Sequence, residues 1–241
     1  MRIVACLNGS RRPGTHPALP VSAEQVAVDA RAAVAAGADT IHVHPRDSSG
    51  TEALEPQVLA PLLDLLRAAV PGVPISVTTA LSAEPDPWRR YDMVQRWGAL
   101  PDSVTVNLHE PGSVEVARLL IDRQVGVAAG VWTVDAARIL VASGLTDGMT
   151  AILVEPAQTT AEDALANAAA IDAVLDRAGV GLPRMLHGAD NTAWPVLDAA
   201  LEAGRDIRIG LADTLRSPDG TEARDNAALV TAAVSRMSAA A

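Results

Sequence analysis

The sequence has few cysteines and few positive charges, and each shortage argues against a class of protein. Among 241 residues there is one cysteine, Cys6, so neither an internal disulfide nor a cysteine-rich zinc site can form. Cys6 lies in an apolar segment, where a small buried thiol is the expected role. Lysine and arginine total 19 against 29 acidic residues. The resulting net charge of -10 argues against nucleic acid as a partner, because phosphate binding needs clustered positive side chains.

Long apolar segments and nucleotide-binding motifs are also missing. No apolar run reaches the roughly 18 residues that a membrane span requires. The first residues, Met1 to Leu7, are followed too soon by polar residues to form a secretory signal peptide. We therefore expect a cytoplasmic protein with no membrane partner. A glycine-rich dinucleotide fingerprint and a phosphate-binding loop are both absent, so the sequence does not indicate a nucleotide cofactor.

Aromatic residues are rare, and the core must therefore be aliphatic. The chain has no phenylalanine, one tyrosine and four tryptophans, although 49% of its residues are hydrophobic. Alanine, valine and leucine supply most of that fraction, and such side chains commonly fill the interior of parallel barrels. The length is also close to the roughly 250 residues of a typical (β/α)8 barrel.

Short apolar segments recur along the chain without polar alternation, which is typical of strands buried on both faces of a parallel sheet. The predicted strands are Ile3–Leu7, Thr40–His44, Ile75–Thr79, Ser103–Leu108, Gln124–Ala128, Ala151–Val154, Arg184–Leu186 and Ile207–Gly210.

Longer segments of helical period follow the strands, with capping residues such as Ser22 and Gln25 before them and glycines after them. The predicted helices are Ala23–Ala36, Pro56–Val70, Pro87–Trp97, Val114–Asp122, Val134–Ser143, Ala161–Ala178, Trp194–Ala203 and Ala223–Ser238. Eight strand–helix units predict an α/β protein, a single (β/α)8 (TIM) barrel domain over residues 1–241. An open, doubly wound sheet remains the alternative.

Polar residues collect where the predicted strands end, and the strand starts carry far fewer. In a (β/α)8 barrel the active site lies at the carboxyl ends of the strands. This asymmetry therefore predicts an enzyme. The residues at the strand ends are Asn8, His42, His44, Arg46, Asp47, Thr78, Thr79, Asn107, His109, Glu110, Glu155, His187, Arg208 and Asp213.

Two histidines, His42 and His44, form the strongest single motif. They are two residues apart on a strand, so both side chains face the same side. Two imidazoles that point into a barrel suit Zn²⁺ or a similar divalent ion. The alternative is a pair of interior histidines hydrogen-bonded to their neighbours. Their position at a strand end favours a metal site.

Arg208 and Asp213 flank the end of the last predicted strand. A guanidinium can hold a carboxylate of the substrate or orient a nearby acid. An arginine beside Asp213 would keep that carboxyl ionised and able to act as a base. The alternative is a structural ion pair that closes the barrel.

The loop after the first strand and two tryptophans are less informative. The loop, Asn8 to Arg12, could bind an anionic group through residues such as Asn8, or could simply be solvated. Trp132 and Trp194 are interpreted as core residues, with pocket walls as the alternative.

Taken in order, the motifs resemble the β-keto acid cleavage enzymes, the family of the 3-keto-5-aminohexanoate cleavage enzyme. The resemblance covers essentially the whole chain. Its motifs are Leu7–Gly9, His16–Pro20, Ala36–Ala38, Ile41–Asp47, Gly50, Leu100–Asp102, Val106–Leu108, Gly130–Trp132, Leu153–Pro156, Leu186–Gly188, Arg208–Leu211, Asp213–Leu215, Pro218–Gly220 and Asn226–Val230.

This resemblance implies a (β/α)8 barrel, a catalytic Zn²⁺ and a homotetramer. It also implies an exchange between a β-keto acid and acetyl-CoA that yields acetoacetate and a new acyl-CoA. The two histidines, here His42 and His44, would bind the zinc, and the pair Arg208 and Asp213 would assist deprotonation of the substrate. A Lewis acid and an ionised base suit a reaction that passes through an enolate.

Three further residues occupy positions where the family lines its pocket with small polar groups. They are Thr79, Thr105 and Asn107. With Asn8, they are the predicted contacts to the substrate.

Two departures from the family pattern affect the predicted metal site. Ala212 stands where the family has the glutamate that completes the zinc site, and Ala128 stands where it has a second pocket glutamate. Water, the substrate or a side chain such as Glu155, Glu110 or His187 would have to complete the coordination.

Two alternatives to the exchange reaction follow from the sequence. The missing glutamates suggest a non-catalytic relative that binds a keto acid or acyl-CoA without turnover. The His-x-His motif and the last-strand aspartate also occur in metal-dependent hydrolases of the amidohydrolase type. In those enzymes the histidine pair normally ends the first barrel strand, whereas here it ends the second.

Overall fold

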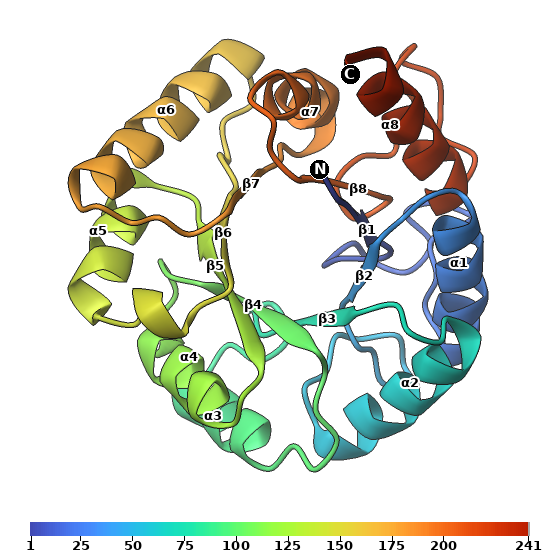
Figure 1. Ribbon diagram of the computed structural model, residues 1–241. Coiled ribbons are helices and arrows are strands. Elements are labelled where there is room, and N and C mark those ends of the chain that lie inside the picture. Colours follow the sequence, from blue (N-terminus) through green and yellow to red (C-terminus); the bar gives the residue numbers. More distant parts are fainter. Residues whose placement is uncertain (241) are drawn as a thin grey trace.

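A computed structural model describes residues 1–240, and its eight parallel strands form a nearly closed barrel inside a ring of helices (Figure 1). The strands are β1 (Ile3–Cys6), β2 (Thr40–Val43), β3 (Ile75–Thr78), β4 (Ser103–Asn107), β5 (Gly126–Val131), β6 (Ala151–Val154), β7 (Arg184–Leu186) and β8 (Ile207–Ile209). The helices are α1 (Ala23–Ala35), α2 (Pro56–Ala69), α3 (Pro87–Gln95), α4 (Ser113–Asp122), α5 (Val134–Ser143), α6 (Ala161–Arg177), α7 (Ala193–Glu202) and α8 (Asn226–Ala240). The predicted (β/α)8 barrel is confirmed.

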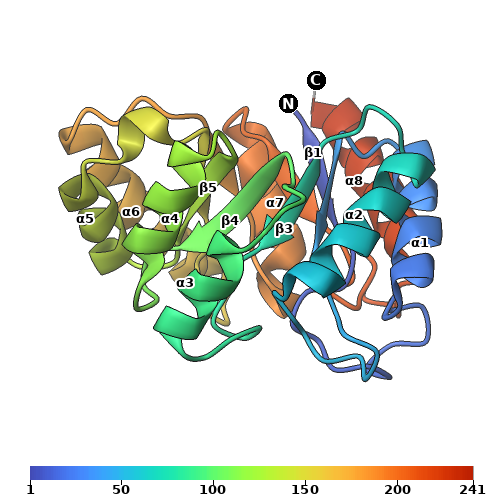
Figure 2. The ribbon, with the colours of Figure 1, turned by 90° about the horizontal axis from the view of Figure 1, so that it is seen from below.

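The strand order is β7-β6-β5-β4-β3-β2-β1-β8, and every neighbouring pair is parallel. β7 and β8 are joined by a single parallel bridge between Met185 and Asp206, which brings the two edges of the sheet together. The open-sheet alternative is therefore wrong. Figure 2 shows the barrel from the side, with the N-terminus at the top and long loops after β1 and β2 at the bottom.

The register between strands decides which side chains share a level inside the barrel. Thr105 on β4 pairs with Ala128 on β5, and Ala128 pairs with Ala151 on β6. Paired residues of parallel strands point to the same side of a sheet. The row of Thr105, Ala128 and Ala151 lines one cavity inside the barrel. Asn107, two residues further along β4, lines a second cavity nearer the carboxyl ends of the strands.

The predicted cap of the first helix forms, and two threonines cap later helices. Ser22 and Gln25 make a reciprocal capping box at the start of α1. Thr133 and Thr160 accept backbone N–H groups at the starts of α5 and α6. These caps satisfy donors that the first turn of a helix otherwise leaves unpaired.

Two elements begin two or three residues later than predicted, and local backbone geometry gives the reason for the first. The fifth strand is Gly126–Val131 instead of the predicted Gln124–Ala128, because Gln124 has a positive φ of 61° and still belongs to the preceding turn. Gly130 lies inside this strand and approaches Asn107 closely. A Cβ at this position would lie 2.3 Å from Asn107 Oδ1, so a larger residue would not fit. The last helix begins at Asn226 instead of Ala223.

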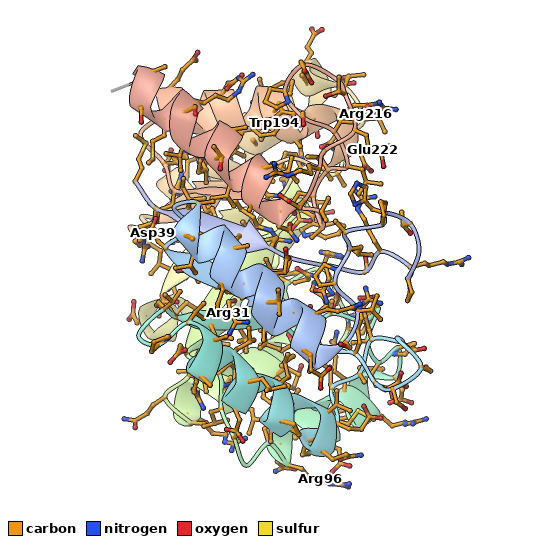
Figure 3. All side chains as sticks on the ribbon, turned by 90° about the vertical axis from the view of Figure 1, so that its right-hand side faces the viewer. Arg31, Asp39, Arg96, Trp194, Arg216 and Glu222 are labelled. Atoms are coloured by element: carbon orange, nitrogen blue, oxygen red, sulfur yellow. The ribbon has the colours of Figure 1, made fainter. Side chains whose placement is uncertain are left out.

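The core follows the aliphatic composition, and Cys6 is buried and free, as predicted. Trp194 is buried as predicted, and its indole N–H donates to the carbonyl of Arg216 at 2.8 Å. Figure 3 shows both residues at one end of the molecule, near Glu222. None of the helices within residues 1–240 is long and apolar enough to cross a membrane.

Candidate functional site

A cavity of about 210 Å³ lies at the carboxyl ends of the strands. It contains six of the eight residues predicted to form the site. These six are His42, His44, Thr105, Asn107, Arg208 and Asp213. Residues that are up to 171 positions apart in the sequence thus line one space. We call it the site cavity. The rest of its lining comes from Gly9, Ser10, Thr78, Ala80, Ser82, Glu110, Trp132, Glu155, His187, Ala189 and Ala212.

The two histidines are oriented by partners at their Nδ1 atoms. His42 Nδ1 lies 3.0 Å from the hydroxyl of Ser76, and His44 Nδ1 lies 2.7 Å from Glu52 Oε2. The ring centroids are 5.4 Å apart. Both side chains therefore keep their Nε2 atoms available to a ligand in the site cavity. Burial, followed by the positive charge of Arg208, lowers the pKa of His42 well below its usual value. The His42 ring is thus neutral and can donate a lone pair.

This arrangement fits a metal ion held through two imidazoles. Histidines that bind metals usually hydrogen-bond through their second ring nitrogen to a carboxylate, carbonyl or water, and the Glu52–His44 pair has this form. Within residues 1–240 there is no group of three or more His, Cys, Asp or Glu side chains around one possible ion position. Ala212 contributes only a methyl group to the lining. The donor set is therefore two nitrogen atoms.

Arg208 and Asp213 form the predicted pair inside the barrel. Arg208 Nε donates to Asp213 Oδ1 at 3.2 Å, and both side chains are almost fully buried. Burial opposes the positive charge of Arg208, but Cys6 and the carboxylates of Asp213 and Glu155 raise the pKa of Arg208 above its usual value. The other oxygen of Asp213, Oδ2, is buried and has no hydrogen-bond partner among the residues that the structure describes.

Gly210 makes the bend between this arginine and this aspartate possible. A Cβ at Gly210 would lie 2.0 Å from the carbonyl oxygen of Cys6, so only glycine fits beside β1 there. The backbone N–H of Asp213 then donates to the carbonyl of Gly210 at 2.9 Å. This tight turn returns the Asp213 side chain toward the guanidinium of Arg208.

A second acid–base pair, Glu155 and His187, lies beside the first. Glu155 Oε2 is 2.9 Å from His187 Nε2, and His187 Nδ1 is 3.8 Å from Asp213 Oδ1. Burial raises the pKa of Glu155, but His187 and Arg208 outweigh it, so the pKa is below the usual value. Glu155 is thus ionised in the site.

Thr105 and Asn107 line the site cavity from β4. The Asn107 amide donates to Glu110 Oε1 at 2.9 Å. Glu110 is in turn held by an ion pair with the buried Arg90. Asn107 is therefore fixed in orientation, whereas the neighbouring Thr105 is half-buried.

Asn8 and Thr79, the other two predicted contacts, lie outside the lining. Asn8 is fully buried, and its amide both donates to the His44 carbonyl at 3.0 Å and accepts from the His44 N–H at 2.9 Å. Thr79 donates its hydroxyl to the Thr105 carbonyl at 2.9 Å. Both residues thus hold the backbone of predicted site residues instead of facing the cavity.

The sequence analysis missed the roles of three residues. Ser76 and Glu52 orient the two histidines, and Trp132 lines the cavity and packs against His109 at 4.7 Å between ring centroids. The interpretation of Trp132 as a core residue was wrong. Ser76 shares the inward side of its strand with Thr78, a signal that the alternation along a strand contains. Glu52 carries no comparable signal, because it reaches His44 across a loop.

Solved structures with the same fold include two complexes of ObcA and a dehydratase. The ternary complex of ObcA with a C4-CoA adduct and oxalate has a TM-score of 0.76 and 13% identity over 93% of this chain. The binary complex of ObcA with oxaloacetate has a TM-score of 0.68 and 15% identity over 90% of this chain. The 3-dehydroquinate dehydratase of Geobacillus kaustophilus has a TM-score of 0.64 and 14% identity, with 99% of this chain and 90% of that enzyme covered.

At these identities the likeness shows the fold alone. The chain spans only 64% and 63% of the length of ObcA in those two complexes. No curated protein sequence matches the chain.

Comparison with protein families gives a more specific result. The family model of the β-keto acid cleavage enzymes matches residues 1–124 and 129–241, and the gap of 125–128 contains Ala128. The match thus includes both histidines as well as Arg208 and Asp213. The chain belongs to the β-keto acid cleavage enzyme family.

Proposed function

We propose that this protein exchanges a β-keto acid with acetyl-CoA, and that the products are acetoacetate and a new acyl-CoA. The observation that carries the proposal is the unpartnered Oδ2 of Asp213, buried in the site cavity beside Arg208. A buried carboxylate oxygen without a partner is costly, so its persistence indicates that a ligand or a reacting proton meets it. Arg208 anchors the other oxygen and fixes the direction of the free one.

In this proposal Asp213 acts as the base. Its Oδ2 takes a proton from the carbon between the carboxylate and the ketone of the substrate. That carbon then attacks the thioester carbonyl of acetyl-CoA and displaces the CoA thiolate. The thiolate attacks the ketone carbon of the original keto acid. The bond between this carbon and the carbon that was deprotonated then breaks, and Asp213 returns the proton to the resulting acetoacetate. The acyl group leaves as the new acyl-CoA, so atoms and charge balance.

Arg208 and the Glu155–His187 pair provide the charges that surround the reacting groups in these steps. The buried guanidinium of Arg208 stabilises negative charge more strongly than it would in water. It therefore favours binding of the anionic substrate beside Asp213. Ionised Glu155 lies 2.9 Å from His187 Nε2, and His187 Nδ1 lies 3.8 Å from Asp213 Oδ1, so these three side chains form one buried cluster.

A divalent metal, with zinc as the proposed identity, would be held by Nε2 of His42 and of His44. When bound, such an ion supplies a Lewis acid that stabilises the enolate form of the keto acid. The chain itself supplies the orientation. Ser76 and Glu52 fix the two rings, and Asn8 fixes the backbone of His44.

Two other observations support a keto acid and a CoA thioester as ligands. The family match concerns β-keto acid cleavage, which favours this chemistry over the hydrolase alternative. ObcA, a protein of the same fold, is described in complexes with oxaloacetate and with a C4-CoA adduct. The cytoplasmic location and the homotetramer stay predictions, and light scattering of the purified protein tests the tetramer.

The decisive experiment is an assay of acetoacetate formation. Purified protein supplied with Zn²⁺ is incubated with acetyl-CoA and a panel of β-keto acids that differ in side chain. We expect acetoacetate from at least one of them and none from the Asp213→Asn variant. Binding of both ligands without turnover would instead support the non-catalytic relative, which Ala212 and Ala128 suggest. Absence of both binding and turnover would contradict both proposals.

A further inference from the structure

A second cavity lies inside the barrel on the amino side of the site. Its volume is about 280 Å³, and we call it the inner cavity. Its lining includes the starts of six strands, so it occupies the half of the barrel opposite the catalytic loops. It is lined by Arg2, Val4, Thr40, His42, Pro74, Ser76, Asp102, Ser103, Thr105, Gly126, Ala128, Thr150, Ala151, Ile152, Leu153, Met185 and Arg208.

The inner cavity exists because the inward side chains of the central strands are small. Bulky branched residues in three layers normally fill this part of a (β/α)8 barrel. Here β4, β5 and β6 present Ser103, Gly126, Ala128 and Ala151 instead. Ala128 and Ala151 are only partly buried. Ala129, which follows Ala128 and faces outward from the barrel, is fully buried. The wall of the barrel is thus packed and its interior is hollow.

The inner cavity meets the site cavity at three residues. His42, Thr105 and Arg208 line both spaces. These three residues therefore lie between the site cavity and the inner cavity. Thr105 is the small side chain among these three, and its paired neighbour Ala128 lines the inner cavity beside it; both are partly exposed. A narrow group that enters from the site would therefore pass beside two small side chains.

The wall of the inner cavity is apolar in its middle and polar at its mouth. Val4, Leu153 and Met185 join Ala128 and Ala151 around the middle. Arg2 and Asp102 lie at the amino end, where Arg2 is paired with Asp206 and Asp102 accepts the N–H of Ile75. The charged groups at the mouth are thus already engaged, and the middle offers surface to an apolar ligand.

We propose that the inner cavity holds the alkyl chain of the β-keto acid, and that the substrates are therefore unbranched aliphatic 3-keto acids of medium length. This proposal rests on the proposed function. The carboxylate and ketone lie at the histidines, Arg208 and Asp213, and the chain passes Thr105 and Ala128 into the barrel. A glutamate at position 128, which the resemblance to the family implies, would put a carboxylate in this space, whereas Ala128 keeps it apolar. Residues 125–128 are also the part of the chain that the family model does not match.

A chain-length series tests the proposal. The specificity constant kcat/KM is measured with 3-keto acids of 4 to 12 carbons and a fixed acetyl-CoA concentration. We expect an increase of roughly fourfold for each added methylene until the inner cavity is full, from the transfer free energy of a buried methylene. Equal rates along the series, or a preference for charged chains, would overturn the proposal.

Filling the cavity gives the matched test. Ala128→Leu and Ala151→Leu each add apolar volume inside the barrel, and Ala68→Leu makes the same change on the exposed surface of α2. We expect the ratio of kcat/KM between 10-carbon and 4-carbon substrates to fall at least tenfold in the first two variants. The ratio in Ala68→Leu should equal that of the unmodified protein. An unchanged ratio in folded Ala128→Leu and Ala151→Leu would contradict the proposal.

A binding measurement separates this proposal from the proposed function. Octanoate carries the carboxylate and the chain but cannot react, so calorimetry reports its binding whether or not turnover occurs. We expect octanoate to bind the unmodified protein and to bind Ala128→Leu at least tenfold more weakly. Turnover of short substrates together with equal octanoate affinities would overturn the inner-cavity proposal alone. Octanoate binding that Ala128→Leu weakens, without turnover of any keto acid, would overturn the exchange reaction alone.

Discussion

The two ends of the barrel come from the same eight strands but differ in most of the side chains that they place inside. At the carboxyl ends, side chains that can carry charge or bind metals crowd around a cavity of about 210 Å³. At the amino ends, serine, glycine and alanine leave a larger space of about 280 Å³. The amino end of such barrels usually contributes stability through packing. The difference teaches that groups able to carry charge or bind metals gather at one end of the barrel, whereas small side chains leave space at the other.

The base at the carboxyl end should show the largest effect. Asp213→Asn keeps the size of the side chain but removes its ability to take a proton, so we expect kcat to fall by about 10²- to 10⁴-fold. The acetoacetate assay measures the change, and acyl-CoA binding by calorimetry serves as the control for folding. A loss of less than tenfold would show that another group, such as His187, is the base.

The orientation of His44 by Glu52 should have the next largest effect. Glu52→Gln weakens the carboxylate–histidine pair, and we expect zinc affinity to fall by roughly 10- to 100-fold. Competition with a chelator measures it. Glu222→Gln is the matched control, because Glu222 lies 3.3 Å from His16 at an exposed position away from the site cavity lining. Equal affinities in both variants would mean that Glu52 does not support a metal ligand.

A carboxylate added at the carboxyl end should strengthen metal binding. Ala212→Glu restores the side chain of the family pattern next to His42 and His44, and we expect zinc affinity to rise by about tenfold or more. The same chelator competition measures the change. If the affinity does not change, another group, such as Glu155, already completes the coordination.

The smallest effect concerns packing at the amino end. Ala151→Val adds apolar volume to the inner cavity, and we expect the free energy of unfolding to rise by about 1 kcal/mol. Ala129→Val makes the same change in the packed wall and should lower that free energy by about 1–3 kcal/mol. Urea unfolding of both variants measures the difference. Similar losses in the two variants would show that the interior is not hollow in solution.

The sequence predicts the strands and most residues at their carboxyl ends, because hydrophobic periodicity and the position of polar residues are local properties of the chain. Seven of the eight strands lie within their predicted bounds, each shortened by one residue at most. The position of His42 and Asp213 in one cavity follows from the rule that strand ends meet at one end of a barrel. Alternation along β3 also predicts that Thr78 faces inward and Thr79 does not, although the family position suggested Thr79.

Other features depend on contacts between distant segments. The Glu52–His44 pair needs a loop to fold back, and Asn8 reaches His44 across 36 positions. The shift of β5 depends on how closely Gly130 approaches Asn107, which no local pattern records. The inner cavity is visible in the sequence only as several small residues, whose inward direction becomes known once the register is set.

The single bridge between β7 and β8 gives the barrel a seam, and the loops at the carboxyl end fasten it. Arg11 donates to the carbonyl of Leu211 at 2.7 Å and forms an ion pair with Asp190, whose own N–H donates to the carbonyl of Asp213 at 2.6 Å. These contacts join the loops after β1, β7 and β8, and we call them the clasp. Local opening in a folded protein begins where few backbone hydrogen bonds hold an edge. Slow separation of this seam would widen the site and the hollow beneath it together, and amide hydrogen exchange along β7 and β8 would record how often the clasp releases.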